Sequence, residues 1–315
     1  MKKISFVIPC YRSAETLPAV VEEIREAMMT LSDRYTHEIV LINDCSPDNT
    51  FEVIRQLANE GEDIVGVDMA KNFGQHAALM AGYRYAKGDI VVSLDDDGQT
   101  PASEVGKLLD KIEEGFDVVY AKYAQKKHSG FRNWGSKVNA KMTETMLGKP
   151  KDLFISSYFA ARRYVIDEIK NYQGSFPYVI GLVLRSTKRI ANVEINHRER
   201  ANGASGYTLK KLISLWVNGF TSFSVKPLRV ASHAGIFSAI VGALYLIYVI
   251  VMYFVSNQAP EGWSSLIGIV LILGGITLVM LGLIGEYVGR IYMCINNSPQ
   301  YVVREEVHYH QEGEK

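Results

Sequence analysis

The chain has few cysteines and no excess of charge of either sign. Its three cysteines, Cys10, Cys45 and Cys294, are widely spaced and form no CxxC pair. A disulfide framework or a zinc site is therefore not expected, and a reducing compartment fits. The 34 basic residues balance the 34 acidic ones, so bulk charge gives no support for a nucleic-acid partner. The first apolar run, ISFVIP, ends at Pro9 and Tyr11, and no signal peptide is predicted.

Charge is also missing from two long stretches near the carboxyl end. Residues 234–255 and 264–285 contain no Asp, Glu, Lys or Arg. About 20 apolar residues are enough for a helix to cross the hydrocarbon layer of a membrane. The alternative is a buried helical hairpin in a soluble protein, but such helices normally show a polar stripe. We therefore expect two transmembrane helices.

The flanks of these stretches predict their orientation. Lys226 and Arg229 precede the first stretch, Arg290 and Arg304 follow the second, and the connecting segment 256–263 has no Lys or Arg. Since positively charged flanks stay on the cytoplasmic side, both termini are expected in the cytoplasm. The residues ahead of the first stretch are then a cytoplasmic domain on a two-helix anchor.

Residues 1 to about 120 alternate between two hydrophobic patterns. Short runs rich in β-branched residues predict strands, and the segments between them have the period of amphipathic helices. The strands are expected at 4–9, 38–44, 64–69, 89–95 and 117–121. The helices are expected at 14–31, 48–59, 74–88 and 102–115. This alternation predicts an α/β fold with a parallel sheet and right-handed crossovers.

Polar residues gather at the predicted carboxyl ends of four strands, in segments 9–15, 43–50, 70–75 and 95–99. An open parallel sheet binds its ligands outside these ends. We therefore expect the functional groups of the domain on one rim of the sheet.

The last of these segments reads DDDGQ. Asp95 and Asp97 are two residues apart, so in an extended chain their side chains point the same way. Two such carboxylates suit Mg²⁺ or Mn²⁺ bound together with substrate phosphates, and Gln99 offers a further oxygen. The sequence has neither GxGxxG nor GxxxxGK[ST], so neutralising the phosphates would be left to the metal. The alternative is a solvated acidic turn before the next helix.

Four further polar positions stand on the same predicted rim. Asp44 follows the second strand, where a carboxylate suits a nucleobase edge or a ribose, with a turn or helix-capping role as the alternative. Tyr11 and Glu15 lie on the first loop, where the alternative is the ordinary start of a helix. Lys71 precedes the third helix and would meet an anion or be a surface lysine.

The rest of the chain gives weaker signals. Residues 121–200 are less regular and contain several basic positions. Segment 207–230 mixes aromatic residues with lysines just before the membrane stretches, as interfacial amphipathic helices do. For His76 we expect a structural role, and for HYH at 308–310 a solvated tail rather than a metal site.

Four motifs follow one another along the first part of the chain: VIPCYRSAETL, IVLINDCSPDNT, NFGQHAALMAG and LDDDGQTP. In this order they resemble the signatures of the family 2 glycosyltransferases, most closely the polyprenyl-phosphate glycosyltransferases. That group includes dolichyl-phosphate mannose synthase, bactoprenol glucosyltransferase and undecaprenyl-phosphate 4-deoxy-4-formamido-L-arabinose transferase. The resemblance continues through FRNWGSKVNA, RERANGASGY, KPLRV and LGLIGEYVGRIY, so it covers nearly the whole chain.

The resemblance implies a GT-A fold that binds a nucleotide-diphosphate sugar and a divalent metal, Mg²⁺ or Mn²⁺. The residues implied to hold the nucleotide are Pro9, Tyr11, Glu15, Asp44, Lys71 and Asp96. Those implied to hold the metal and the diphosphate are Asp95, Asp97 and Gln99. Those implied to meet the acceptor phosphate are Arg132, Lys137 and Ser205. Catalysis is assigned to Asp95, Asp97, Arg132 and Arg200, with Arg200 and Ser205 near the donor diphosphate.

One position departs from the family pattern. Many relatives have a lysine after the serine of RERANGASGY, whereas this chain has Gly206. The departure puts the phosphate contact of that position in question. Lys210 or Lys211, one helical turn on, is a candidate substitute.

The implied function is inverting transfer of a sugar, expected from a UDP-hexose, to undecaprenyl phosphate for modification of a cell-envelope glycan. A phosphate monoester is close to its dianion at neutral pH, because its second pKa is about 6, so no catalytic base is needed. The alternatives are a glycosyltransferase with another lipid or glycan acceptor, and a non-catalytic membrane scaffold for a flippase. The implied partners also include further copies of the chain in a homotetramer and a flippase.

Patterns and resemblance together predict a multi-pass protein of the bacterial plasma membrane with its catalytic domain in the cytoplasm. The predicted parts are a GT-A domain over 1–206, interfacial helices over 207–232, a two-helix anchor over 233–289 and a cytoplasmic tail over 290–315.

Overall fold

The computed structural model describes residues 1–123, 144, 148–196, 226–256 and 262–309. The chain divides into two compact units. One comprises Met1–Leu215 together with Asn297–Lys315, and the other comprises Trp216–Asn296. The first unit is therefore built from two sequence segments that flank the second.

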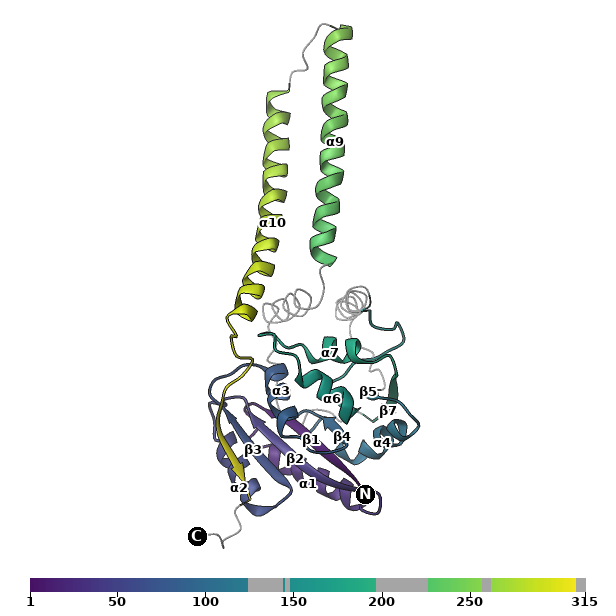
Figure 1. Cartoon of the computed structure of the whole chain (residues 1–315), viewed down its shortest axis with the longest axis vertical. Coiled ribbons are helices and arrows are strands. Elements are labelled where there is room, and N and C mark those ends of the chain that lie inside the picture. Colours follow the sequence, from purple (N-terminus) through teal and green to yellow (C-terminus); the bar gives the residue numbers. More distant parts are fainter. Residues whose placement is uncertain (124–143, 145–147, 197–225, 257–261, 310–315) are drawn as a thin grey trace. The chain divides into compact units, whose positions relative to one another are not determined.

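The first unit contains a sheet of eight strands among its described residues. They are β1 Lys2–Cys10, β2 Tyr35–Asn43, β3 Ile64–Met69, β4 Ile90–Ser93, β5 Val118–Tyr123, β6 Phe159–Arg162, β7 Ile190–Ile195 and β8 Val303–His308. Their order across the sheet is β7-β5-β6-β4-β1-β2-β3-β8 (Figure 1). The strands from β4 to β3 all run parallel. β6 is antiparallel to β4 and β5, β8 is antiparallel to β3, and β5 pairs parallel with β7.

Helices cover both faces of this sheet (Figure 1). They are α1 Leu17–Met29, α2 Thr50–Glu60, α3 Gln75–Tyr85, the 3-10 turn η1 Ala102–Glu104, α4 Val105–Glu113, α6 Arg163–Lys170 and α7 Val179–Ser186. α1, α2 and α4 pack on the face that carries Ile4, Phe6 and Ile8 of β1, all fully buried. α3 packs against β1 and β2 and also contacts α6 and α7. The central residues of the parallel strands are mostly apolar because both of their faces are buried.

Gly82 sets the distance between α3 and the sheet. A Cβ built on this residue would lie 2.5 Å from Val7 Cγ1 and 2.6 Å from Ile42 Cδ1. Both atoms belong to fully buried strand side chains, so a larger residue would push the helix away from the sheet. The close approach brings the first turn of α3 next to the ends of β2 and β4.

The five strands and four helices predicted for residues 1 to about 120 are confirmed. Residues 121–200 contain β6, α6, α7 and β7, which the sequence pattern did not indicate. The predicted fifth strand, β5, is consequently not the neighbour of β4, because β6 lies between them and runs antiparallel to both. The sheet is mostly parallel, as the family resemblance implied.

β8 comes from the segment after the second unit and covers the edge of the sheet at β3. Val307 lies opposite Gly66 and is buried. Arg304 Nη1 lies 3.1 Å from Oδ2 of Asp68, a buried β3 side chain. The HYH motif begins at His308, the last residue of β8. Sequence reasoning expected only a solvated tail here and did not predict this strand.

The second unit contains two long helices, α9 Lys226–Ser256 and α10 Trp263–Ile295. Among the described residues, one stretch is long and apolar enough to cross a membrane, Leu273–Ile295 of α10. The other predicted span stays a prediction. Glu286 and Arg290, one helical turn apart in α10, form an ion pair, with 2.6 Å between Oε1 and Nη2. Most of the predicted interfacial segment lies outside the described residues, and its last residues are the start of α9.

Candidate active site

Hydrogen bonds connect the loops that follow the four parallel strands. The backbone N–H of Arg12, after β1, donates to Ser46 Oγ, after β2, at 3.1 Å. The backbone N–H of Phe73, after β3, donates to Asp44 Oδ1, after β2, at 2.7 Å. The segment after β4 is tied to the loops after β1 and β3 through its aspartates. The four strand ends therefore form one connected rim, as the topology of a parallel sheet requires.

Asp96 holds the loop after β1. Its Oδ2 accepts hydrogen bonds from the backbone N–H of Tyr11 at 3.0 Å and from the hydroxyl of Ser13. Its backbone carbonyl accepts the hydroxyl of Thr16 at 2.7 Å. Arg12, in the middle of this loop, has a left-handed φ of 59°, which such local bonds offset. Burial raises the pKa of Asp96, and the bonds from Ser13 and Tyr11 oppose that rise.

Asp95 is bound from two other elements. Gln75 Nε2, in the first turn of α3, donates to its Oδ1 at 2.9 Å, and the hydroxyl of Ser157, just before β6, donates to its Oδ2. Burial raises the pKa of Asp95 to about 6, with a further rise from the charges of Asp97 and Asp96. The carboxylate is therefore held by two donors, and the charges of its two neighbouring aspartates act on it.

Asp97 turns back on its own segment. The backbone N–H of Gln99 donates to Asp97 Oδ1 at 3.1 Å. Gly98, between them, has φ +70°, a conformation that glycine adopts without strain. Tyr123, at the end of β5, lies close enough that the charges of Asp95 and Asp97 add to the burial that raises its pKa. The three aspartates thus have different surroundings although they are consecutive.

Asp44 sits at the amino terminus of α3. The backbone N–H groups of Phe73 and Gly74 donate to its two carboxylate oxygens, at 2.7 and 2.9 Å. Burial raises its pKa, and the two backbone bonds oppose the rise. Phe73 and Gly74 lie just before Gln75, the first residue of α3, so the carboxylate fixes the loop that leads into this helix. A carboxylate has about four acceptor positions, so two remain for a ligand.

The other residues predicted on the rim occupy different settings. Pro9 is buried within β1, opposite Ile42. Tyr11 and Glu15 are exposed on the loop after β1. Lys71 is exposed, with its Nζ 4.8 Å from the centre of the Phe73 ring. Tyr11, Glu15 and Lys71 are accessible to a ligand, whereas Pro9 is buried.

Four predicted site residues lie outside the described residues: Arg132, Lys137, Arg200 and Ser205. The same holds for Gly206 and its candidate substitutes. Their assignments stay predictions.

His76 follows Gln75 in α3 and faces Tyr178, with ring centroids 4.9 Å apart and an interplanar angle of 77°. Its Nδ1 is shielded from solvent and has no hydrogen-bond partner among the described residues. Burial lowers the pKa of His76 to about 4, so the ring is neutral at physiological pH. This packed, uncharged ring agrees with the structural role expected for it.

The carboxylates of this rim fit a divalent cation that is shared with a ligand. In the described part of the chain, no group of three or more His, Cys, Asp and Glu side chains is placed to hold a metal by itself. Mg²⁺ and Mn²⁺ are bound by one or two carboxylates together with substrate phosphates. Asp95 and Asp97 supply two carboxylates. Burial raises the pKa of Asp95, the charges of Asp97 and Asp96 raise it further, and a cation would offset those charges.

Sequence reasoning missed Ser157 and Gln75 as partners of Asp95. Gln75 belongs to a motif of the rim but was given no role of its own. Ser157 has no motif; it reaches the site because β6 pairs antiparallel with β4, with Phe159 opposite Ser93. Continuing that register by two residues brings Ser157 opposite Asp95. The contact between Ser157 and Asp95 could therefore be predicted only if the pairing of β4 with β6 were known.

Comparison with known proteins gives the family of the chain. The model described as Glycosyl transferase family 2 matches residues 5–170, and that described as GtrB C-terminal hairpin matches residues 226–291. The undecaprenyl-phosphate 4-deoxy-4-formamido-L-arabinose transferase of Aeromonas hydrophila subsp. hydrophila is 35% identical, over 97% of this chain and 94% of its own. The uncharacterized glycosyltransferase YkcC of Bacillus subtilis is 34% identical, over 95% of this chain and 93% of its own.

Among solved structures, the fold is similar to glucosyl-3-phosphoglycerate synthase from Mycobacterium tuberculosis in complex with Mn²⁺, UDP and phosphoglyceric acid. The TM-score is 0.50 at 20% identity, covering 68% of this chain and 74% of that one. This likeness concerns the fold, a GT-A α/β fold with a mostly parallel sheet. With the family match and the full-length relatives, it leads to one conclusion: the chain belongs to glycosyl transferase family 2 and is a glycosyltransferase of the GT-A fold.

Proposed function

We propose that this glycosyltransferase transfers a sugar from a nucleotide-diphosphate sugar, expected to be a UDP-hexose, to undecaprenyl phosphate. The observation that carries the proposal is the rim where Asp96 is bonded to the loop after β1 and Asp95 is bonded to the first turn of α3, with Asp97 on the same segment. It stands on a chain that is 35% identical to a relative named for transfer to this lipid phosphate. The product would be a polyprenyl-phosphate sugar used in cell-envelope glycan modification.

The reaction needs charge control more than proton transfer. A phosphate oxygen of the acceptor attacks the anomeric carbon of the sugar, and the bond from that carbon to the nucleoside diphosphate breaks. Attack from the side opposite the leaving diphosphate inverts the anomeric centre. Because the acceptor monoester has a second pKa of about 6, it is already a nucleophile at neutral pH. What the enzyme must supply is orientation and stabilisation of negative charge.

Within this proposal, two of the three consecutive aspartates bind the metal. Asp95 and Asp97 would hold Mg²⁺ or Mn²⁺ with the donor diphosphate, and Gln99 would add an oxygen. A bound divalent ion would neutralise the charge of the leaving diphosphate. The M. tuberculosis synthase of similar fold was crystallised with Mn²⁺ and UDP, which supports a divalent ion here and leaves open which one is used.

The nucleotide would lie along the loops after β1, β2 and β3. Asp44 and Asp96 already accept two hydrogen bonds each from these loops, so we assign them first to shaping the nucleotide site. Their remaining acceptor positions are available to the base and ribose. The other nucleotide-site residues proposed are Pro9, Tyr11, Glu15 and Lys71.

The acceptor side of the proposal rests on basic residues. Arg132 and Lys137 would cancel the repulsion between the acceptor phosphate and the donor diphosphate. Arg200 and Ser205 would approach the diphosphates and help close the site. These assignments come from the family motifs alone.

The pairing of β8 with β3 supports a membrane hairpin with both ends on the same side of the membrane, which the basic flanks predict to be the cytoplasm. Residues before α9 and residues after α10 belong to one sheet, so both must lie on the same side of the membrane. An even number of crossings satisfies this condition. We therefore propose that α9 crosses the membrane as well as α10, in the bacterial plasma membrane. The anchor would keep the active site at the headgroup level, where the lipid acceptor is found.

The finer domain limits, the homotetramer and a flippase partner are retained as proposals from the resemblance.

The test is transfer by the full chain, reconstituted in lipid nanodiscs with a short polyprenyl phosphate, Mn²⁺ and a panel of labelled UDP- and GDP-sugars. We expect label in a lipid that mild acid releases, since sugar phosphates are acid-labile. Label in an acid-stable glycolipid would point to another acceptor. No labelled lipid with any donor would overturn the proposal and favour the scaffold.

A further inference from the structure

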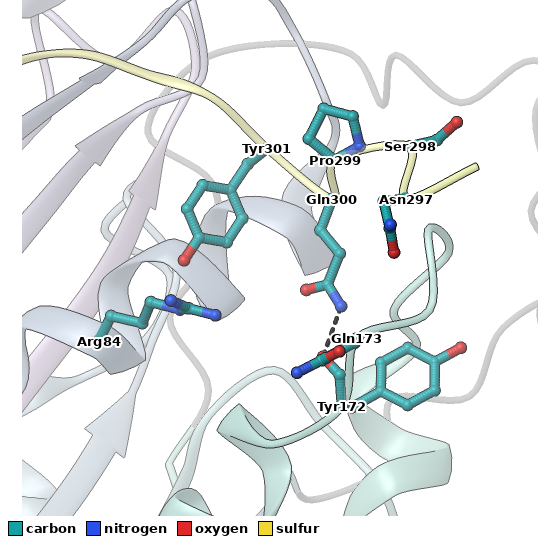
Figure 2. A pocket seen from close by; sticks show the side chains of 8 residues that line it. All are labelled: Arg84, Tyr172, Gln173, Asn297, Ser298, Pro299, Gln300 and Tyr301. Carbon is teal, nitrogen blue, oxygen red and sulfur yellow. Dashed lines mark hydrogen bonds between the residues drawn. The ribbon is translucent and has the colours of Figure 1, made fainter. Parts of the chain in front are cut away.

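A pocket outside the predicted active site lies where three segments of the first unit meet (Figure 2). Arg84 comes from the last turn of α3, Gln173 from the loop after α6, and residues 297–301 from the segment that leads into β8. The volume of the pocket is about 250 Å³. Typical small-molecule sites measure roughly 300–1,000 Å³, so this one suits a small group or headgroup.

Arg84 is the only charged side chain among the described residues that line the pocket. In the described part of the chain, no carboxylate forms an ion pair with it. Its guanidinium carbon lies 5.9 Å from the centre of the Tyr301 ring. That contact attracts a cation without neutralising its charge. An arginine in this setting offers its fork of donors to an anion.

The walls of the pocket are fixed by hydrogen bonds. Gln300 Nε2 donates to the backbone carbonyl of Tyr172 at 2.6 Å, and Ser175 Oγ donates to the backbone carbonyl of Ser298 at 3.0 Å. These bonds fasten the segment after α10 to the loop after α6. The protein's own hydrogen bonds therefore hold the shape of the pocket, which lowers the cost of binding a ligand.

Amide groups complete the lining. Figure 2 shows the guanidinium of Arg84 pointing to the side of the pocket where the amides of Gln173 and Gln300 lie, with Asn297 above them. Side-chain amides donate hydrogen bonds to anionic oxygens as well as accepting them. The described lining thus combines one uncompensated positive charge with neutral donors.

The position of the pocket suggests where its ligand comes from. The candidate membrane span ends at Ile295, and Asn297 is two residues further on, so its Cα lies within about 8 Å of the end of the span. Arg84 follows Gln75 by nine residues in α3, about 13 Å along the helix axis. One residue of the pocket is therefore close along the chain to the candidate membrane span, and Arg84 is separate from the predicted active site.

We propose that this pocket binds a phosphate group, carried by an anionic phospholipid headgroup or by free phosphate. Arg84 pairs with the phosphate oxygens, and the amides around it donate the remaining hydrogen bonds. A lipid bound here holds the segment between α10 and β8 against the membrane surface. The proposal concerns membrane attachment and does not depend on which sugar is transferred.

The test is ligand-induced thermal stabilisation of the full chain, purified in a neutral maltoside detergent. The probes are dioctanoyl phosphatidylglycerol, dioctanoyl phosphatidylcholine, and inorganic phosphate compared with chloride at equal ionic strength. Arg84→Gln removes the pocket charge. Lys87→Gln removes the same charge three residues on, from an exposed side chain that does not line the pocket. Arg84→Lys keeps the charge and loses the fork.

We expect the wild type and Lys87→Gln to bind phosphatidylglycerol more tightly than phosphatidylcholine. Arg84→Gln should weaken phosphatidylglycerol binding about tenfold, and Arg84→Lys should be intermediate. If inorganic phosphate stabilises the wild type and this effect is lost in Arg84→Gln, the natural ligand is free phosphate.

Three results would overturn the proposal. They are no stabilisation by either phosphatidylglycerol or phosphate, equal affinities in the wild type and Arg84→Gln, and an equal loss in Lys87→Gln. Should Arg84→Gln fail to fold, the comparison between the wild type and Arg84→Lys decides, since only a pocket that uses the fork distinguishes them.

Discussion

The two halves of the sheet contribute to the candidate site in different ways. The parallel half, from β4 to β3, ends in loops that carry Asp44 and the aspartates 95–97. The mixed half, from β7 to β6, contributes Ser157 and the end of β5. The parallel half thus supplies the carboxylates, and the mixed half supplies groups that hold or surround them. The proposed metal-binding carboxylates all come from the parallel half, so substitutions in the two halves should have different consequences.

The largest effect is expected in the parallel half, at Asp97. Asp97→Asn removes one of the two carboxylates proposed to hold the metal, so kcat should fall about a thousandfold while the protein still inserts and folds. The measurement is sugar transfer by the full chain in nanodiscs.

Asp110→Asn is the matched control, because it makes the same change on an α4 side chain that is 61% exposed. It should leave transfer unchanged. Near-normal activity of Asp97→Asn without added metal would remove the functional distinction between the halves.

A second effect concerns how the parallel half is packed. Gly82→Ala places a methyl group against Val7 and Ile42, where an added Cβ would lie 2.5 and 2.6 Å from their atoms. Overpacking of this kind costs about 1–3 kcal/mol, measured by denaturant unfolding of the full chain in detergent.

Gly106→Ala provides the contrast on the other face of the sheet. Its added Cβ would lie 3.9 Å from Leu31, an ordinary contact, and alanine favours a helix over glycine by about 1 kcal/mol. A slight gain in stability is expected. If the two variants behaved alike, close packing of α3 would not explain how its first turn is placed at the rim.

In the mixed half, Ser157→Ala should lower kcat about tenfold, because Asp95 loses one of its two donors. The affinity for Mn²⁺, followed by electron paramagnetic resonance, should weaken in parallel. Ser156→Ala is the control: that hydroxyl donates to the backbone carbonyls of Ala121 and Tyr158, each at 2.8 Å.

Ser156→Ala should therefore reduce stability by about 1 kcal/mol and leave Mn²⁺ binding unchanged. The reverse pattern would show that Ser157 is the structural residue of the pair.

The smallest effect is a pH-dependent one in the parallel half. Burial alone would raise the pKa of Asp63, but His37 and Arg25 lower it well below its usual range. A carboxylate with a lowered folded pKa stabilises the protein above its unfolded pKa of about 3.9 and loses that contribution as the pH falls.

Asp63→Asn should thus reduce the free energy of unfolding by about 1 kcal/mol at pH 7. The difference from the wild type should shrink as the pH is lowered below about 4. Urea titrations at several pH values measure it. A difference that stays constant down to pH 3 would show that the ionised form of Asp63 does not matter.

The strands and loops of the parallel half could be predicted from the sequence because each is encoded by a short contiguous segment. Each of its strands is a short apolar run, and each loop follows directly, so the meeting of Asp44 and Asp95 on one rim needed only the rule for parallel sheets. The mixed half gave no such signal. Ser157 is two residues from β6, and its partner follows from an antiparallel register between segments more than sixty residues apart along the chain.

Two other features were hidden for related reasons. Asp96 holds a loop in which Arg12 takes a left-handed backbone conformation. No residue pattern in the sequence predicts that conformation. β8 reads VREEVH, and the charges that protect an edge strand from unwanted pairing also make it look like a solvated tail.

The position of β8 bears on how a soluble version of the enzyme should be designed. Ending the chain before α9 would discard β8 and leave the backbone groups of β3 without the partners they have in the whole chain. An uncovered strand edge recruits other chains, so that truncated protein should aggregate. Joining the end of the first segment to Asn297 through a short flexible linker would restore the missing strand and give a single-chain domain suited to crystallisation.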